Sequence, residues 1–420
     1  MRITDSFFGR HLQHWASDIT CYRRILMGLF VLALALRITV AFIHPYYLPD
    51  SADYSSLAKT IAAGHTYQVK DQFARRMPGY PVFVAIFYYL FGIHILPVLL
   101  VQACLGGITV ILTAQLGRLL SPVTGLISGA MVAVDPLGIG FSAALLSETL
   151  FTCLLVLSVV MLVHLMDRPN RWLSWIDLGL IWAMMIYVRA EIALCLPPLL
   201  VLVIWMAKTR NRRRTNGLGG LLTLSVVFIC LLPWWVRNYS NFHQAFFRFT
   251  TLEGISLYES VYSGATGGPR QSDLVIPPSF QQLNESQRDI AWTHRAFSDI
   301  FHHPWRMIRL AFIKIARTWS PWLHARGYSN FKMNILLTIW YTTLFIFAIA
   351  GMRHFSIKPS LFGVLLLIIL YFTCMHAVFL GSVRYRVPVM PLVMVLAAVG
   401  IYPPGTVSET TRTMERGVCS

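Results

Sequence analysis

The feature that most constrains this chain is a series of apolar runs, most of them close to the length that crosses a bilayer. A crossing helix needs about 20 apolar residues, because the hydrocarbon core is about 30 Å thick. Hydrophobic residues make up 56% of the 420 residues and charged residues only 13%, which excludes an ordinary water-soluble domain. The sequence predicts an all-α polytopic membrane protein with about ten transmembrane helices and with interfacial helices in its outer loops.

The predicted spans alternate with polar connections of very different lengths. They are Ile25–Ile43, His94–Gln115, Pro122–Ser142, Glu148–Met166, Ser174–Val188, Ala190–Met206, Gly217–Val236, Phe331–Gly351, Ser360–Leu380 and Val387–Tyr402. Pro81–Gly92 is apolar but too short to cross, so we expect it in the outer interface. We assign residues 1–402 to one transmembrane domain, with outer loops at 44–93 and 237–330, and residues 403–420 to a cytoplasmic tail.

Basic residues set the predicted orientation. Connections rich in Lys and Arg stay in the cytoplasm, and the strongest such signal is KTRNRRR at residues 208–214. The arginines between Arg2 and Arg24 also place the start of the chain inside, so both termini are predicted to be cytoplasmic. The formal net charge of +17 is spread over these connections, where membrane lipids explain it better than nucleic acid does. The basic and aromatic stretch at residues 302–322 predicts a second interfacial helix.

The outer loop from Tyr46 to Tyr80 is longer than a turn requires. Its charged residues exclude it from the hydrocarbon core of the membrane. Its length, and the glycine and proline residues that interrupt it, favour a functional loop. We take Asp50 as its chemical centre, although an Asp here also fits a helix cap. Asp53 fits a cap or a solvated loop acid better.

Ionisable residues beside apolar runs are costly, so each is a candidate for function. On the predicted topology they gather in one layer at the outer face: Asp50, Arg75, Arg76, Asp135, Glu148, Arg189, Glu191, Arg237, Arg384 and Arg386. Guanidinium groups bind phosphate bidentately. A carboxylate whose pKa is raised by a low-dielectric site can accept a proton from a hydroxyl or amine. Together they suit sugar transfer from a polyprenyl phosphate by direct displacement at the anomeric carbon.

Eight stretches spread over nearly the whole chain carry a resemblance to a known family. They are PDSADYSSLAKTIAAG (49–64), RRMPGYPVF (75–83), LLSETLF (145–151), VRAE (188–191), PWWVRNY (233–239), GISLYESVYSGATGG (254–268), HPWRMIRLAFIKIARTWSP (303–321) and RYRVPVMP (384–391). The chain resembles the integral-membrane glycosyltransferases of the C superfamily, specifically the dolichyl-phosphate-mannose protein mannosyltransferase-like and aminoarabinose transferase-like group (glycosyltransferase family 39-like). This implies an inverting transferase of the cell envelope, in a bacterial inner membrane, with its active site on the outer face.

The resemblance also implies roles for individual residues. Asp50 resembles the catalytic base and Glu148 a second catalytic carboxylate. The residues predicted to bind the donor phosphate are Arg384, Arg386, Arg75 and Arg76. The candidates for substrate binding are Tyr54, Tyr80, Arg237 and Tyr258. The chain departs from the family pattern in having Ser51, not a second acid, after Asp50, and in lacking a large soluble domain after the last span. The donor would be a polyprenyl-phosphate sugar and the acceptor a lipid, protein or polysaccharide.

Several alternatives stay open. Asp50 and Glu148 would supply oxygen ligands if a divalent cation took part, but no cofactor is required by the spacing, and the seven cysteines show no metal or disulfide pattern. Arg384 and Arg386 also fit snorkelling anchors. Arg189 and Glu191 fit a turn clamp better, and His376 a hydrogen-bonded core residue. The other functions that fit are a ligase for a lipid-linked glycan and, without catalysis, a lipid or polysaccharide flippase or a scaffold.

Overall fold

The computed structural model describes residues 18–69, 72–169, 171–243, 247–269, 274–324 and 331–404. Arg2, Arg10 and most of the predicted tail, residues 405–420, lie outside these ranges. Within them the chain forms helices and no β-strand, with two isolated bridges, Tyr46 to Ala144 and Val69 to Gln72. The prediction of an all-α fold is confirmed.

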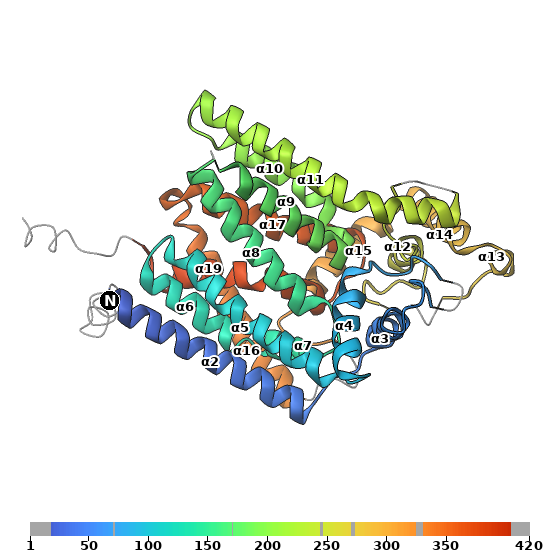
Figure 1. Cartoon of the computed structure of the whole chain (residues 1–420), viewed down its shortest axis with the longest axis horizontal. Coiled ribbons are helices and arrows are strands. Elements are labelled where there is room, and N and C mark those ends of the chain that lie inside the picture. The colour runs from blue at the N-terminus through green and yellow to red at the C-terminus, as the bar shows by residue number, and fades with distance from the viewer. Residues whose placement is uncertain are drawn as a thin grey trace, which may run out of the picture.

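The apolar helices run side by side along the long axis of the molecule (Figure 1). Seven are long and apolar enough to cross a membrane: α2 (Ile19–Ile43), α5 (Leu96–Arg118), α8 (Glu148–Asp167), α11 (Arg210–Phe242), α16 (Phe331–Met352), α17 (Pro359–Val378) and the segment Val383–Ile401. That last segment comprises α18 (Val383–Arg386), η5 (Val387–Val389) and α19 (Met390–Ile401).

The other three predicted spans are interrupted or short. α6 (Pro122–Ala133) and α7 (Pro136–Ser142) form one candidate span that is bent by 52°. α9 (Trp172–Val188) and the pair η2 (Ala190–Cys195) and α10 (Leu196–Trp205) are apolar but shorter than the seven. All ten predicted spans therefore coincide with helices, and the chain is an integral membrane protein.

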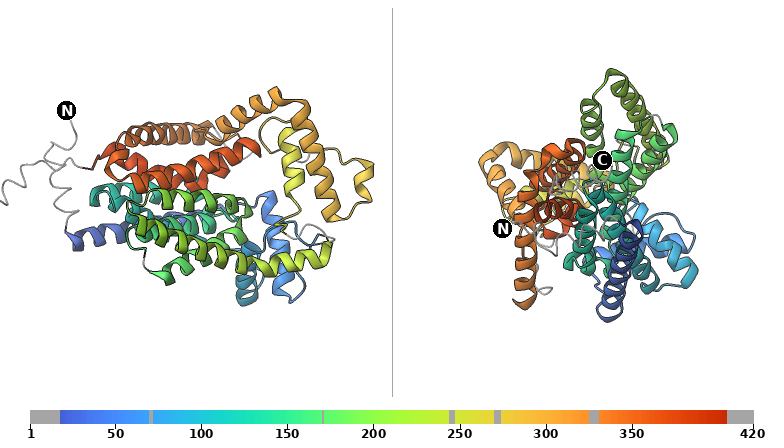
Figure 2. Two further views of the ribbon diagram at one scale, coloured as in Figure 1. Left: turned by 90° about the horizontal axis from the view of Figure 1, so that it is seen from above. Right: turned by 90° about the vertical axis from the view of Figure 1, so that its left-hand side faces the viewer.

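Shorter helices form a layer over one end of the bundle, on the right of Figure 1 and of the left view in Figure 2. They are α3 (Pro49–Ala62), α4 (Gly79–Phe91), α12 (Glu253–Val261), α13 (Pro278–Gln281), α14 (Glu285–His302) and α15 (Pro304–Thr318). A 3-10 helix, η4 (Phe355–Ile357), joins α16 to α17. We call the six helices the outer layer. It joins the two long loops predicted at residues 44–93 and 237–330.

The bundle is held together by close helix packing around α19 and α8, most of whose residues are buried. Transmembrane helices lack a hydrophobic drive to associate in lipid, so small residues that let backbones approach have a large effect. Gly351 of α16 and Gly400 of α19 face each other in this way: a Cβ on Gly400 would lie 2.0 Å from the carbonyl oxygen of Phe347. This packing fixes α19, and through it α18, at the centre of the bundle.

Candidate active site

A cavity of about 410 Å³ lies between the bundle and the outer layer. Its walls come from α3, residues 75–77, η2, α12 with the loop before it, the end of α17, and α18. Asp50, Tyr54, Arg75, Arg76 and Arg384, five of the predicted site residues, line it. The fold thus brings residues from both ends of the sequence to one concave surface.

Asp50 holds the centre of the polar wall. Its Oδ1 accepts a hydrogen bond from Nη2 of Arg76 at 2.6 Å, and its Oδ2 accepts one from Nη1 of Arg384 at 2.6 Å. The cap of α3 is Leu48, whose backbone N–H donates to Ser51 Oγ. Asp50 lies in the first turn after that cap, where the helix dipole favours a negative charge. The capping interpretation of Asp50 is therefore wrong.

Two opposing effects act on the Asp50 carboxyl. Burial alone raises its pKa, but the Arg76 and Arg384 guanidiniums outweigh burial and hold the pKa below its ordinary value. The expectation of a pKa raised toward neutrality is therefore wrong for the protein without substrate. As long as both arginines pair with it, Asp50 is a weak proton acceptor.

Arg384 joins Asp50 to the second predicted carboxylate. Its Nε donates to Oε1 of Glu148, which is in the first turn of α8 and is fully buried. The same oxygen accepts a hydrogen bond from Nη1 of Arg189 at 3.2 Å, and Nε of Arg189 lies 2.9 Å from Oε1 of Glu191. Arg189 and Glu191 do pair, as a turn clamp would, but they also line the cavity and extend the network.

On its other side, Asp50 is linked to Asp53 through Arg76. Oδ2 of Asp53 lies 3.0 Å from Nη2 of Arg76 and 3.2 Å from Nε of Arg75. Asp53 is thus an ion-pairing residue, not the cap or solvated acid expected from the sequence. The result is an unbroken series of alternating charges, which we call the ionic chain: Arg75, Asp53, Arg76, Asp50, Arg384, Glu148, Arg189 and Glu191. Its four arginines balance its four carboxylates.

Arg386, predicted to bind phosphate with Arg384, does not line the cavity. It is 1% exposed and donates to the backbone carbonyls of Thr318 and Ser320. Its guanidinium lies over the Tyr341 ring, 4.4 Å from the centroid. Residues two apart on a helical turn point to different faces, so α18 directs Arg384 into the cavity and Arg386 into the core.

Three further predicted residues lie outside the cavity lining. Tyr80 is fully buried and donates to Oε1 of Gln102 at 2.6 Å. Tyr258 packs on Trp292, with ring centroids 4.8 Å apart. Arg237 donates to a backbone carbonyl of the first outer loop and stacks on neighbouring rings. These contacts support the loops around the cavity; of the predicted aromatic residues only Tyr54 lines it.

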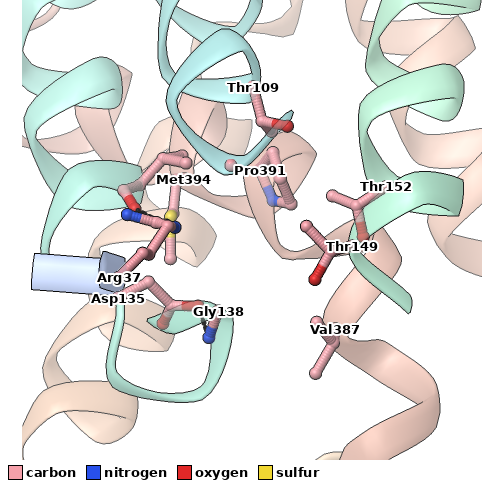
Figure 3. Close-up of a pocket in the computed structure, with 11 residues that line it drawn as sticks. Arg37, Thr109, Asp135, Gly138, Thr149, Thr152, Val387, Pro391 and Met394 are labelled. Atoms are coloured by element: carbon pink, nitrogen blue, oxygen red, sulfur yellow. Dashed lines mark hydrogen bonds between the residues drawn. The ribbon is translucent and has the colours of Figure 1, made fainter. Parts of the chain in front are cut away.

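Asp135 and Arg37 lie near each other inside the bundle, apart from the cavity (Figure 3). Asp135 caps α7 by accepting from Gly138 N at 2.8 Å, and it accepts from the Tyr341 hydroxyl at 2.6 Å. Arg37 donates to backbone carbonyls at the end of α6. The space beside them is only about 30 Å³, which is too small for a substrate. The charged residues predicted to gather at the outer face therefore divide into two groups: those in or beside the cavity, and those with a structural role in the bundle.

The residues present do not fit a divalent cation. Asp50 accepts hydrogen bonds on both oxygens from arginines, and Oε1 of Glu148 accepts from two more donors. Within the described ranges, no three His, Cys, Asp or Glu side chains form a group suited to metal binding. A cation between Asp50 and Glu148 would have to displace Arg384, whose charge already bridges them.

Three titratable residues that line the cavity were not among the site residues predicted from the sequence: Glu253, Tyr385 and His376. Glu253 is in α12, and burial raises the pKa of its carboxyl. Tyr385 follows Arg384 directly, so its place in the same turn was the available signal. His376 was predicted to be a hydrogen-bonded core residue, but neither of its ring nitrogens has a hydrogen-bond partner among the described residues.

Comparison with known proteins gives one family match. Residues 75–236 match the family described as dolichyl-phosphate-mannose-protein mannosyltransferase. The match includes Glu148 and Arg189 and ends before His376 and Arg384. No curated protein matches the chain significantly.

Solved structures match the chain at low sequence identity, and those with a TM-score above 0.5 share its fold. The oligosaccharyltransferase AglB from Archaeoglobus fulgidus, in complex with an inhibitory peptide and a dolichol-phosphate, is 11% identical with a TM-score of 0.60, over 97% of this chain and 53% of that one. The apo form of the Archaeoglobus fulgidus oligosaccharyltransferase is 12% identical with a TM-score of 0.58, and the match covers 96% of this chain and 52% of that one. ArnT from Cupriavidus metallidurans, bound to undecaprenyl phosphate, is 13% identical with a TM-score of 0.41, and the match covers 91% of this chain and 77% of that one.

This chain therefore spans about half the length of the archaeal oligosaccharyltransferase. The family match and the shared fold confirm the resemblance to the C-superfamily glycosyltransferases that the sequence motifs predict.

Proposed function

We propose that this chain transfers a sugar from a polyprenyl phosphate to an acceptor hydroxyl or amine, with inversion, at the outer face of a bacterial inner membrane. The observation that carries the proposal is the position of Asp50, between Arg76 and Arg384 on the wall of the large cavity. The family match to residues 75–236 supports a glycosyltransferase. The dolichol-phosphate in the Archaeoglobus structure supports a polyprenyl phosphate as the carrier.

The arginines are suited to the leaving group. In the proposed reaction the acceptor oxygen or nitrogen forms a bond to the anomeric carbon, the bond from that carbon to the phosphate oxygen breaks, and polyprenyl phosphate leaves. Guanidinium groups stay protonated and bind phosphate with two parallel hydrogen bonds. Arg384 and Arg76 would stabilise the charge that develops on this phosphate. Ala193, Leu194, Met375 and Phe379 supply an apolar wall suited to the prenyl chain.

Donor binding would also change Asp50. A phosphate that takes over Arg384 and Arg76 removes the two charges that hold the Asp50 pKa down, while the burial that raises it stays. Asp50 then becomes a stronger base, and it accepts the proton that the acceptor loses as the new bond forms. Deprotonation is thereby coupled to the presence of a donor, and Glu148 keeps Arg384 in place from the buried side.

The test is release and transfer of labelled sugar from polyprenyl-phosphate donors by purified protein in detergent. We expect Asp50→Asn to lower turnover by at least about 100-fold, the size of a general-base effect, and Glu148→Gln to lower it as well. Asp167→Asn is the matched control, because Asp167 ends α8 far from the cavity and is exposed.

The outcomes separate the proposals. Full activity of Asp50→Asn would contradict the assignment of the base. Wild-type protein that is folded but inactive with every polyprenyl-phosphate sugar would overturn the transferase and favour a flippase or scaffold. Activity only with a whole glycan on its lipid carrier would identify a ligase instead.

A further inference from the structure

His376 is a buried polar side chain on the cavity wall, beside the backbone of Leu380 and near the charges of Glu191 and Arg189. It lies in the last turn of α17, is 3% exposed and lines the cavity. Neither ring nitrogen has a hydrogen-bond partner in the described part of the chain. Buried polar groups in proteins are nearly always hydrogen-bonded, so an imidazole that faces a cavity in this state points to a group supplied by a ligand.

The imidazole ring is held in a fixed orientation. It stacks on Tyr385, with ring centroids 4.7 Å apart and planes within 8° of parallel. The Phe372 ring lies 6.1 Å away on the same helix. Tyr385 follows Arg384, which binds Asp50. His376 is thus held against Tyr385, the residue that directly follows the cavity arginine Arg384.

Resting on the proposed function, we propose that His376 binds a hydroxyl group of the sugar carried by the donor and acts as a specificity-determining residue. A neutral imidazole offers one N–H donor and one nitrogen acceptor, and a hydroxyl group offers both complementary functions. The donor sugar is bonded directly to the phosphate, so a sugar on a phosphate bound by Arg384 would lie in the cavity that Tyr385 and His376 also line. An acceptor hydroxyl has the same chemistry, and the test below therefore contains no acceptor.

The test compares binding of undecaprenyl phosphate with binding of undecaprenyl-phosphate-linked mannose, glucose and galactose to the purified full chain in detergent. His376→Phe removes both nitrogens and keeps a ring to stack on Tyr385. We expect the wild type to bind at least one sugar-linked lipid about fivefold more tightly than the bare lipid, the effect of one or two hydrogen bonds. In His376→Phe the ratio should fall to about one, with affinity for the bare lipid unchanged.

Three further variants sharpen the result. His376→Asn retains a donor and an acceptor, so it should keep part of the preference. His376→Leu also removes both nitrogens, and it replaces His376→Phe if that variant fails to fold. His164→Phe is the matched control, because His164 lies on α8 more than four turns from Glu148 and bonds to its own helix. It should bind all four lipids as the wild type does.

A preference for the sugar-linked lipid that persists in His376→Phe would overturn this inference. So would an equal loss of affinity for the bare lipid, since that indicates a structural role, or a wild type that binds all four lipids equally. Failure of the proposed function gives a different result: wild-type protein that binds none of the four lipids.

Discussion

Arg384 and Arg386 show how two residues of one motif can have different environments. Arg384 lies on the cavity wall, where it pairs with Asp50 and, on its buried side, with Glu148. Arg386 is enclosed by backbone carbonyls and the Tyr341 ring. Both were predicted to bind phosphate. Their positions now assign the phosphate role in the proposal to Arg384 and a packing role to Arg386.

A pair of Arg→Lys substitutions tests this division. Lysine keeps the charge but lacks the planar fork that reaches two carboxylates or one phosphate bidentately. We expect Arg384→Lys to lower kcat/KM for the donor by about 10- to 100-fold. Arg386→Lys should keep kcat/KM within about twofold and instead lower the stability by about 1–3 kcal/mol. Donor kinetics and thermal unfolding in detergent measure both, and a larger kinetic loss in Arg386→Lys would reverse the assignment.

At the scale of elements, the contact of α16 with α19 controls where Arg384 lies. Gly351 and Gly400 allow the two backbones to touch: a Cβ on Gly351 would lie 1.9 Å from the Leu396 carbonyl oxygen. The chain continues directly from α18 through η5 into α19. A change in the packing of α19 therefore moves α18, and with it the centre of the ionic chain.

Gly400→Ala tests the importance of this contact. The added methyl group meets the backbone of α16, which cannot move away as a flexible side chain can. We expect a loss of about 1–3 kcal/mol, the usual cost of overpacking, and a fall in donor turnover as α18 shifts. Gly28→Ala is the control, because a Cβ on Gly28 in α2 meets nothing within 4 Å. Equal unfolding midpoints for Gly400→Ala and the wild type would contradict the interpretation.

For the molecule as a whole, the proposal requires the cavity and the connection at residues 208–214 to face opposite sides of the membrane. α11 begins in that basic connection and ends beside the outer layer (Figure 1). The positive-inside rule places the basic end in the cytoplasm. The cavity would then open on the outer face, where a lipid-linked donor and an envelope acceptor can meet.

Cysteine labelling tests this orientation in a variant without native cysteines. Val275→Cys, at a residue that is 85% exposed in the second outer loop, should react with a membrane-impermeant maleimide in intact cells. Lys208→Cys, at an exposed residue at the opposite end of the bundle, should react only after the membrane is permeabilised. The reverse pattern would place the cavity in the cytoplasm and exclude an outer-face reaction.

The class of the molecule, and the gathering of ionisable residues at the ends of its apolar runs, could be predicted from the sequence alone. The hydrocarbon core accepts helices, whose backbone groups are hydrogen-bonded internally, and excludes most charged side chains. Membrane-spanning segments, and the charged residues at their ends, can therefore be recognised in the sequence. The positions of Asp50, Glu148, Arg384 and the Arg75–Arg76 pair at the ends of apolar runs are enough to assign them to that layer. The apolar helices could be located in the same way; seven of them are long enough to be candidate spans, one further candidate is bent, and two are shorter.

Which of those charges meet depends on the packing of the helices. Asp50 and Arg384 are 334 residues apart in the sequence, and Glu148 and Arg384 are 236 apart. Their pairing depends on how α3, α8 and α18 pack, and helix periodicity does not encode that. The same packing turned Arg386 into the core, joined Arg189 and Glu191 to the ionic chain, and left His376 facing the cavity. The pKa of Asp50 is likewise set by neighbours that only the folded chain brings within hydrogen-bond distance.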